Sequence, residues 1–187
     1  MTEPQALGWQ SDNTLMEQVR EGDSRKLAML FERHHEALFR YFLRMTGDRP
    51  YSEDMVQEVF FRVLKYRGTY RQEAQFTTWM YRIARNAHID NLRRRKWEVP
   101  MEEDWDAPGP PAESPEKRQE AEVVRRALLA IPEDKRELLI MTRYQEMKYE
   151  QIAEVLGVEV GTVKVRIHRA LRSLRETYQA MGGGRKP

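Results

Sequence analysis

The sequence predicts an all-α protein made of two small helical domains joined by an acidic, proline-rich linker. Apolar residues recur at steps of three and four along most of the chain, which is the period of an amphipathic helix. No stretch of the sequence shows the sustained alternation that a half-buried strand requires. Five of the nine prolines fall within residues 98–116 and separate two helical regions.

In the first helical region, three apolar stripes each predict a helix. They lie within residues 27–45, 51–66 and 76–95. Gly47 and Asp48 form a stop signal after the first stripe, and Pro50 suits the first turn of the next helix. Gly68 ends the second stripe. We expect these helices to form one domain over residues 14–96.

The stretch from Glu98 to Glu116 holds seven acidic residues and no lysine or arginine. Such a composition cannot bury enough apolar surface to offset the entropy lost on ordering. We therefore expect residues 97–115 to form a flexible acidic linker. The two ends of the chain, residues 1–13 and 181–187, are expected to be disordered.

The second helical region, residues 116–180, is expected to form a domain of four helices. They cover residues 117–130, 132–147, 149–156 and 160–178. The last two have the pattern of a helix-turn-helix. Ala153 is small enough for these helices to cross closely, Gly157 permits a turn that would strain other residues, and Val163 fills the junction.

Basic residues are concentrated on the last of these helices. From Gly161 onward there are seven lysines and arginines and one acidic residue, Glu176. A basic second helix in a helix-turn-helix is suited to lie in a DNA major groove. Duplex DNA is therefore a predicted partner. The residues on this face are Lys164, Arg166, His168, Arg169, Arg172 and Arg175.

Composition and motifs exclude several classes of function. The chain has no cysteine, which rules out disulfides and thiolate metal sites and suits a reducing cytoplasm. No apolar run approaches the roughly 20 residues that span a bilayer, and the polar start does not resemble a signal peptide. No phosphate-binding loop, metal-ligand spacing or nucleophile–base pair stands out. We expect a cytoplasmic protein without membrane insertion that is not an enzyme and uses no metal or cofactor.

The predicted helix 51–66 has a polar face that includes a large aromatic residue. Asp54, Gln57 and Glu58 share this face with Phe61. A solvated acidic face is the simplest interpretation. Polar groups around an aromatic anchor are also typical of a binding patch, so this face is a candidate docking surface.

The predicted helix 76–95 carries a second basic face, interrupted by negative charge only at Asp90. The loop before it, residues 66–72, interleaves tyrosines with arginines. Aromatic faces beside cations can hold an unstacked base and its phosphate, while packing of these tyrosines in the core is an equally good interpretation. Phe76 and Trp79 are expected to lie in the core. The basic face comprises Arg82, Arg85, Asn86, Ile89 and Arg93.

Four sequence blocks occur in a specific order and spacing. They are SEDMVQEVFFRVL (52–64), FTTWMYRIARNAHIDNLRR (76–94), IPEDKRELLIM (131–141) and YEQIAEVLGVEVGTVKVRIHRAL (149–171). Together they resemble the extracytoplasmic-function (ECF, group IV) sigma factors of bacterial RNA polymerase. The resemblance extends from Leu15 to Tyr178, and it implies a region 2 bundle followed by a region 4 helix-turn-helix.

The resemblance also implies a role for each surface. The first domain would bind the β and β′ subunits of the polymerase core through Asp54, Gln57, Glu58 and Phe61. It would capture an unpaired base of the promoter −10 element with Tyr70, Arg82, Arg85, Asn86, Asp90 and Arg93. The second domain would read the −35 element as duplex with Thr162, Lys164, Val165, Arg166, His168 and Arg169. A function in stress response and a possible anti-sigma factor partner are implied by the family as well.

Two other functions remain open from the residues alone. An autonomous helix-turn-helix regulator would use residues 15–96 as a sensor or dimer module, but no dimerisation heptad supports it. A metal-dependent nucleic-acid enzyme would use Glu53, Asp54 and Glu58, but a docking face explains these acids better.

Overall fold

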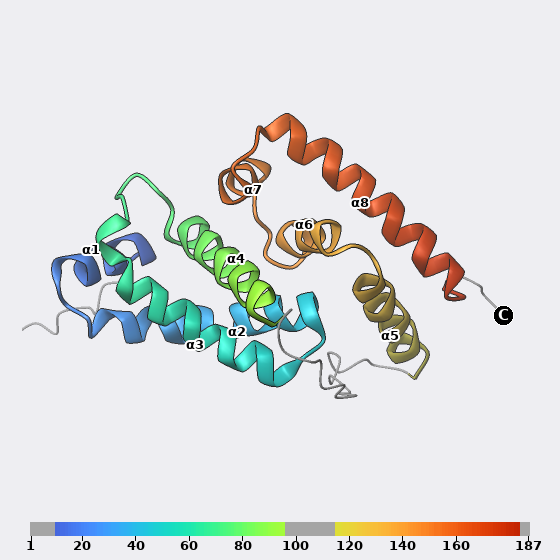
Figure 1. Cartoon of the computed structure of the whole chain (residues 1–187), viewed down its shortest axis with the longest axis horizontal. Coiled ribbons are helices and arrows are strands. Elements are labelled where there is room, and N and C mark those ends of the chain that lie inside the picture. Colours follow the sequence, from blue (N-terminus) through green and yellow to red (C-terminus); the bar gives the residue numbers. More distant parts are fainter. Residues whose placement is uncertain (1–9, 96–114, 184–187) are drawn as a thin grey trace, which may run out of the picture.

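The protein, for which we use a computed structural model, is described over residues 10–95 and 115–183, and these residues form helices joined by turns (Figure 1). The expected all-α class is confirmed for this part of the chain, which contains no strand. The predicted linker lies outside the described residues except at Pro115, where a helix begins. The elements are α1 (Asp12–Glu21), α2 (Lys26–Thr46), α3 (Arg49–Lys65), the 3-10 turn η1 (Arg67–Thr69), α4 (Phe76–Arg95), α5 (Pro115–Ala130), α6 (Glu133–Arg143), α7 (Tyr149–Leu156) and α8 (Val160–Ala180).

Helix α1 corresponds to no predicted stripe, and it begins at Asp12, inside the segment expected to be disordered. Ser11 caps it, because its hydroxyl oxygen accepts a 3.2 Å hydrogen bond from the backbone N–H of Thr14. The side-chain oxygen of Asn13 accepts a 2.9 Å hydrogen bond from the backbone N–H of Phe76. Helix α1 therefore also caps the start of α4.

Helices α2, α3 and α4 form the core of the first domain, with breaks where the sequence predicts them. Gly47 ends α2 in the left-handed conformation, with φ of 76°. The Asp48 carboxylate then caps α3 by accepting a 2.8 Å hydrogen bond from the backbone N–H of Tyr51. The bounds of α4 coincide with the predicted helix 76–95.

The predicted helix-turn-helix is confirmed in α7 and α8. Gly157 adopts a φ of 65° between them, and the backbone N–H of Val158 donates a 3.0 Å hydrogen bond to the carbonyl of Ala153. Val163 is fully buried at the junction. The crossing and the turn are thus fixed by the small residues and the glycine.

The predicted helix 132–147 is too long, because α6 ends at Arg143. Glu146 adopts a positive φ of 51°. This turn directs Met147 back into the core, where only 7% of it is exposed. Burial of Met147 therefore outweighs continuation of the helix.

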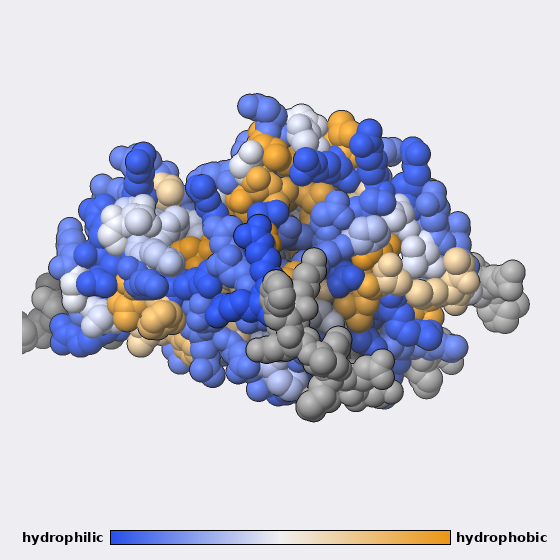
Figure 2. Space-filling model, viewed as in Figure 1, coloured by the Kyte–Doolittle hydropathy of each residue, from blue (hydrophilic) through white to orange (hydrophobic). Residues whose placement is uncertain are grey.

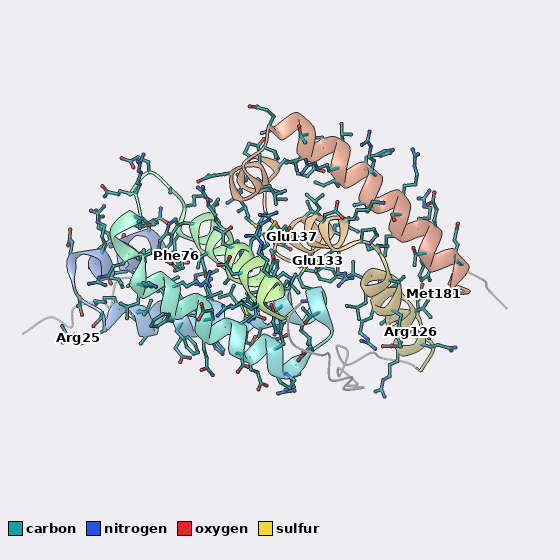
Figure 3. All side chains as sticks on the ribbon, in the orientation of Figure 1. Arg25, Phe76, Arg126, Glu133, Glu137 and Met181 are labelled. Atoms are coloured by element: carbon teal, nitrogen blue, oxygen red, sulfur yellow. The ribbon has the colours of Figure 1, made fainter. Side chains whose placement is uncertain are left out.

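The two domains pack against each other, α2 against α5 and α6 and α4 against α7. Glu137 of α6 lies at the centre of this contact, on the side of α6 that faces α4 (Figure 3). Its carboxylate accepts hydrogen bonds from the Tyr41 hydroxyl at 3.0 Å and from Arg85 Nε at 3.2 Å. Burial raises the pKa of the Glu137 carboxyl above its ordinary value. The domain contact therefore has a polar centre.

Arg136 joins the domains through backbone carbonyls. Its guanidinium donates to the carbonyls of Leu128 at 3.0 Å and Ile131 at 3.1 Å, and also to that of Leu129. It further donates to the carbonyl of Met45, at the end of α2 in the first domain. One side chain thus satisfies helix-end carbonyls in both domains.

His88 of α4 is a buried histidine in the same contact, with 2% exposure. Its Nδ1 lies 2.6 Å from the Tyr51 hydroxyl, and its Nε2 lies 3.0 Å from a carboxylate oxygen of Glu133. A neutral imidazole satisfies both contacts, with Tyr51 donating to Nδ1 and Nε2–H donating to Glu133. Burial lowers the pKa of His88 below its ordinary value of 6.5.

We expect the melting temperature to fall as the pH is lowered from about 7.5 to about 5.5, and to fall less in His88→Gln. The unfolded chain takes up the proton first, because the folded pKa of His88 is depressed. The stability that neutral His88 contributes is therefore present above pH 6.5 and is lost as the pH falls through the folded pKa. Differential scanning calorimetry of both proteins checks this. Glu137 titrates in the opposite sense but is common to both proteins, and parallel pH profiles would contradict the expectation.

Candidate nucleic-acid interface

An exposed aromatic surrounded by polar side chains lies on α3. Phe61 is 61% exposed, and Gln57 and Asp54 are exposed one and two turns before it, respectively. Glu58 is half-buried beside them. We call these four residues the α3 patch. The structure therefore brings together the residues predicted to dock on a partner protein.

Arg62 connects the α3 patch to α4. Its Nε donates to the Glu58 carboxylate at 2.6 Å, and its NH1 donates to the Asp90 carboxylate at 2.7 Å. Asp90 is thereby paired, although its side chain remains 48% exposed. The negative charge that interrupts the basic face of α4 is compensated within the domain.

A hollow of about 550 Å³ lies between η1, the loop after it and α4. Its wall contains the rings of Tyr66 and Trp79 together with Arg82 and Asn86, two of the residues predicted to hold an unpaired base. Arg71 of the loop also lines it. Two aromatic rings, two guanidinium groups and an amide thus face one space large enough for a base.

Tyr70, another of the six residues predicted to hold the unpaired base, does not line this hollow. It is 2% exposed, its hydroxyl donates a 2.9 Å hydrogen bond to the carbonyl of Ala74, and burial raises its pKa to about 12. Its ring meets Trp79 edge-on at 5.3 Å between centroids. Tyr70 therefore fixes the loop and the Trp79 ring, because a buried ring offers no face to a base.

Tyr66, Arg71 and Trp79 line the hollow but are absent from the residues predicted to bind the −10 element. Trp79 was expected in the core, and it is in fact half-buried, with its ring shared between core and hollow. Tyr66 is 43% exposed. The signal available in the sequence was the loop's alternation of tyrosine and arginine, which does not say which tyrosine faces outward.

The remaining predicted residues of α4 differ in accessibility. Arg93 is exposed near the end of the helix. Arg85 is half-buried and engaged by Glu137 of the second domain, as described above. Arg85 is thus occupied within the protein in this arrangement of the domains.

The outer face of α8 carries the residues predicted to read duplex DNA. Thr162 is half-buried, and the other five are exposed, including Val165 at 51%. The opposite face is fixed in the core, where Val163 and Ala170 are fully buried. Figure 2 shows mostly hydrophilic residues along this edge of the molecule. The exposed five are Lys164, Val165, Arg166, His168 and Arg169.

Within residues 10–95 and 115–183, no three histidine, cysteine or acidic side chains are arranged so that they could hold a metal ion. Over the same residues, none of the helices combines the length and the apolar character needed to cross a bilayer.

Comparison with known proteins identifies both domains. Residues 30–98 match the family Sigma-70 region 2, and residues 121–174 match the family Sigma-70, region 4. The RNA polymerase sigma-H factor of Pseudomonas aeruginosa is 30% identical over 188 residues, which cover 94% of this chain and 97% of that protein. The ECF RNA polymerase sigma factor SigL of Mycobacterium tuberculosis is 33% identical and covers 82% of this chain and 89% of its own length.

Solved structures share the fold. CnrH in complex with the cytosolic domain of CnrY matches with a TM-score of 0.71 and 24% identity, covering 91% of this chain and 99% of that one. RpoE of Bartonella quintana, in complex with the anti-sigma factor NepR, matches with a TM-score of 0.70 and 22% identity, covering 81% of this chain and 96% of that one.

The chain therefore belongs to the sigma-70 family and contains a region 2 and a region 4 domain. Within that family it is of the ECF type, an RNA polymerase sigma factor that directs transcription initiation. Sigma factors bind the polymerase core and promoter DNA and are not enzymes. Of the three functions considered from the sequence, namely sigma factor, autonomous regulator and metal-dependent enzyme, the sigma factor is confirmed.

Proposed function

We propose that this sigma factor recognises its promoter with two separate surfaces, a duplex-reading face on α8 and a single-strand hollow beside α4. The observation that carries the proposal is the hollow, because it gathers aromatic rings, cations and an amide of the first domain around one space. An aromatic ring can stack on a base only when that base is unpaired, and the cations and the amide can then hold its phosphate and its edge.

The face of α8 is proposed to read the −35 element in the major groove. Lys164 and Arg169 can donate to guanine edges, and Val165 suits an apolar contact such as a thymine methyl. Arg166 is assigned to a phosphate, which sets the register of the helix on the duplex. His168 completes the reading face, and Thr162 lies at its N-terminal end.

The hollow is proposed to hold one flipped base of the −10 element. Tyr66 or Trp79 supplies a stacking face, which is worth about 1–3 kcal/mol per base. Asn86 can hydrogen-bond the base edge, while Arg82 attracts the adjacent phosphate. This offsets the few kcal/mol that extrusion of a base costs. Promoter opening therefore requires no hydrolysis, only tighter binding of the open strand.

The α3 patch is proposed to dock on the polymerase core, with contacts to its β and β′ subunits. Phe61 is the anchor, because a 61% exposed phenylalanine among polar groups gains most from burial. Arg62 holds Glu58 in place for this contact.

An anti-sigma factor is a further proposed partner. The structure of RpoE from Bartonella quintana was solved in complex with its anti-sigma factor NepR, and the shared fold supports a partner of this class here. A cytoplasmic location and a function in stress response are proposed with it.

Arg169→Ala is expected to weaken binding to the upstream element by about 1–3 kcal/mol and to relax selectivity at one base pair. The guanidinium lies on the exposed face of α8 and supports no described ion pair, so the fold should be unaffected. Competition of holoenzyme between matched and singly mismatched promoters measures the effect. Arg175→Ala, farther along α8, serves as the control and should lower affinity without changing selectivity. Unchanged selectivity in Arg169→Ala would contradict the assignment.

Run-off transcription from a genomic library, with and without the purified chain, tests the proposed function. With core polymerase present, the chain should direct initiation from a small set of start sites that share two upstream elements. Transcripts that begin at the same positions without the chain would refute it.

A further inference from the structure

We propose that helix α1 sets the base selectivity of the single-strand hollow, with Glu17 and Arg20 as the residues that position the loop on its rim. This inference rests on the proposed function of the hollow. It assigns a role to a helix that lies before residues 30–98, the stretch that matches the region 2 family. None of the residues predicted to bind the −10 element belongs to this helix.

Side chains of α1 hold the loop between η1 and α4 at its beginning, its middle and its end. Arg20 NH1 donates to the backbone carbonyl of Tyr70 at 3.4 Å. The Glu17 carboxylate accepts a 2.8 Å hydrogen bond from the side-chain amide of Gln72. At the far end Asn13 caps α4, as described above. Helix α1 packs against both η1 and α4 (Figure 1), so it holds the loop at three points.

Two groups of the hollow depend on the position of this loop. Arg71, which lies between the two held residues, lines the hollow. The Tyr70 ring meets the Trp79 ring edge-on and thereby supports the face that Trp79 offers to a base. A shift of the loop would therefore move one guanidinium and one stacking ring. A site distinguishes between bases only when such groups are held in place by their supporting contacts.

Glu17 supports more of this contact than any other side chain of α1 described above. One of its carboxylate oxygens accepts from Gln72, and the other accepts from Arg20 NH2 at 3.1 Å. The same carboxylate therefore orients the guanidinium whose NH1 reaches Tyr70. Removing it would release Gln72 and leave Arg20 free to turn toward solvent. One side chain thus supports two of the three contacts.

The fold of the domain does not depend on these two side chains. The side chains of Glu17 and Arg20 are 24% and 34% exposed, and ion pairs of this kind contribute little to stability. The contribution of the pair is therefore expected in the position of the loop rather than in the melting temperature. Helix α1 is anchored by three fully buried apolar residues, Leu15, Met16 and Val19.

Base discrimination by the holoenzyme on preopened DNA tests the positioning role. A promoter found by run-off transcription is prepared with an unpaired −10 element, and each of the four bases is placed in turn at each non-template position. Competition between these templates gives the relative affinities. The wild-type holoenzyme is expected to prefer one base at one position. Glu17→Ala is expected to lower this preference about fivefold, the effect of about one lost hydrogen bond to the base.

Three further variants separate positioning from charge and from folding. Glu17→Gln keeps an acceptor for Gln72 and should retain most of the preference. Glu21→Ala removes the same charge from an exposed residue of the same helix and should behave as wild type does. Gln72→Ala releases the loop without altering α1 and should lower the preference as Glu17→Ala does. Assembly with core polymerase, selectivity at the −35 element and the melting temperature should be unchanged in all four variants.

The outcomes separate the inference from the function on which it rests. An unchanged base preference in Glu17→Ala or in Gln72→Ala would overturn the inference, and so would an equal loss in Glu21→Ala. A matching loss of selectivity at the −35 element would overturn it as well, because it would indicate a general defect of the protein. A wild-type holoenzyme with no base preference in the unpaired −10 element would overturn the proposed function of the hollow itself.

Discussion

Replacing Phe61 and Gln57 together by alanine is expected to weaken assembly with core RNA polymerase by about 2 kcal/mol or more, roughly a 30-fold increase in the dissociation constant. Phe61 is the exposed aromatic of the α3 patch, and Gln57 lies one turn before it. Both side chains point to solvent and alanine is a good helix former, so the fold and the melting temperature should not change.

Titration of labelled chain with core polymerase measures this dissociation constant. The matched control is Glu36→Ala with Arg40→Ala, which removes two exposed side chains from another helix of the same domain. The control should assemble normally. If the Phe61 and Gln57 variant formed holoenzyme as tightly as wild type, the α3 patch would not be the docking surface.

Arg136→Ala is expected to lower the free energy of unfolding by about 3 kcal/mol. The substitution leaves four carbonyls without their charged donor: three at the C-terminal end of α5, on Leu128, Leu129 and Ile131, and the fourth, on Met45, in the other domain. Because Arg136 joins the domains, the loss should also loosen their contact. Few other single side chains of the described chain satisfy so many backbone groups.

Urea unfolding followed by circular dichroism measures the change. Arg126→Ala, an exposed arginine on α5, removes the same charge and should change stability by less than about 0.5 kcal/mol. Arg136→Lys should be intermediate, since lysine keeps the charge but loses the planar fork of donors. A stability of Arg136→Ala equal to wild type would contradict the assigned role.

Helices whose bounds are set by an apolar stripe or by a terminating glycine could be predicted from the sequence. Helix α4 has a long periodic stripe, and α7 is ended by Gly157, whose positive φ few other residues adopt. Helix α1 escaped prediction because it depends on a cap from Ser11 and on packing against α4, neither of which appears as a stripe. Helix α6 is shorter than predicted because Met147 turns inward, a tertiary effect.

The candidate site was predictable to the level of surfaces rather than of every side chain. The faces of α3 and α8 follow from helical periodicity, and their residues lie together as expected. Which tyrosine of the loop faces outward depends on how α1 and Trp79 pack, and the structure places Tyr66 rather than the predicted Tyr70 at the hollow. The pairing of Arg85 with Glu137 joins residues from two domains, and no local pattern reveals it.

The most direct test of the central claim is permanganate probing of a promoter found by run-off transcription. With the chain and core polymerase together, thymines near the −10 element should become reactive, while core alone and chain alone should leave them protected by pairing. Reactivity with core polymerase alone, or transcription directed by the chain with no reactive thymine at that element, would contradict the account.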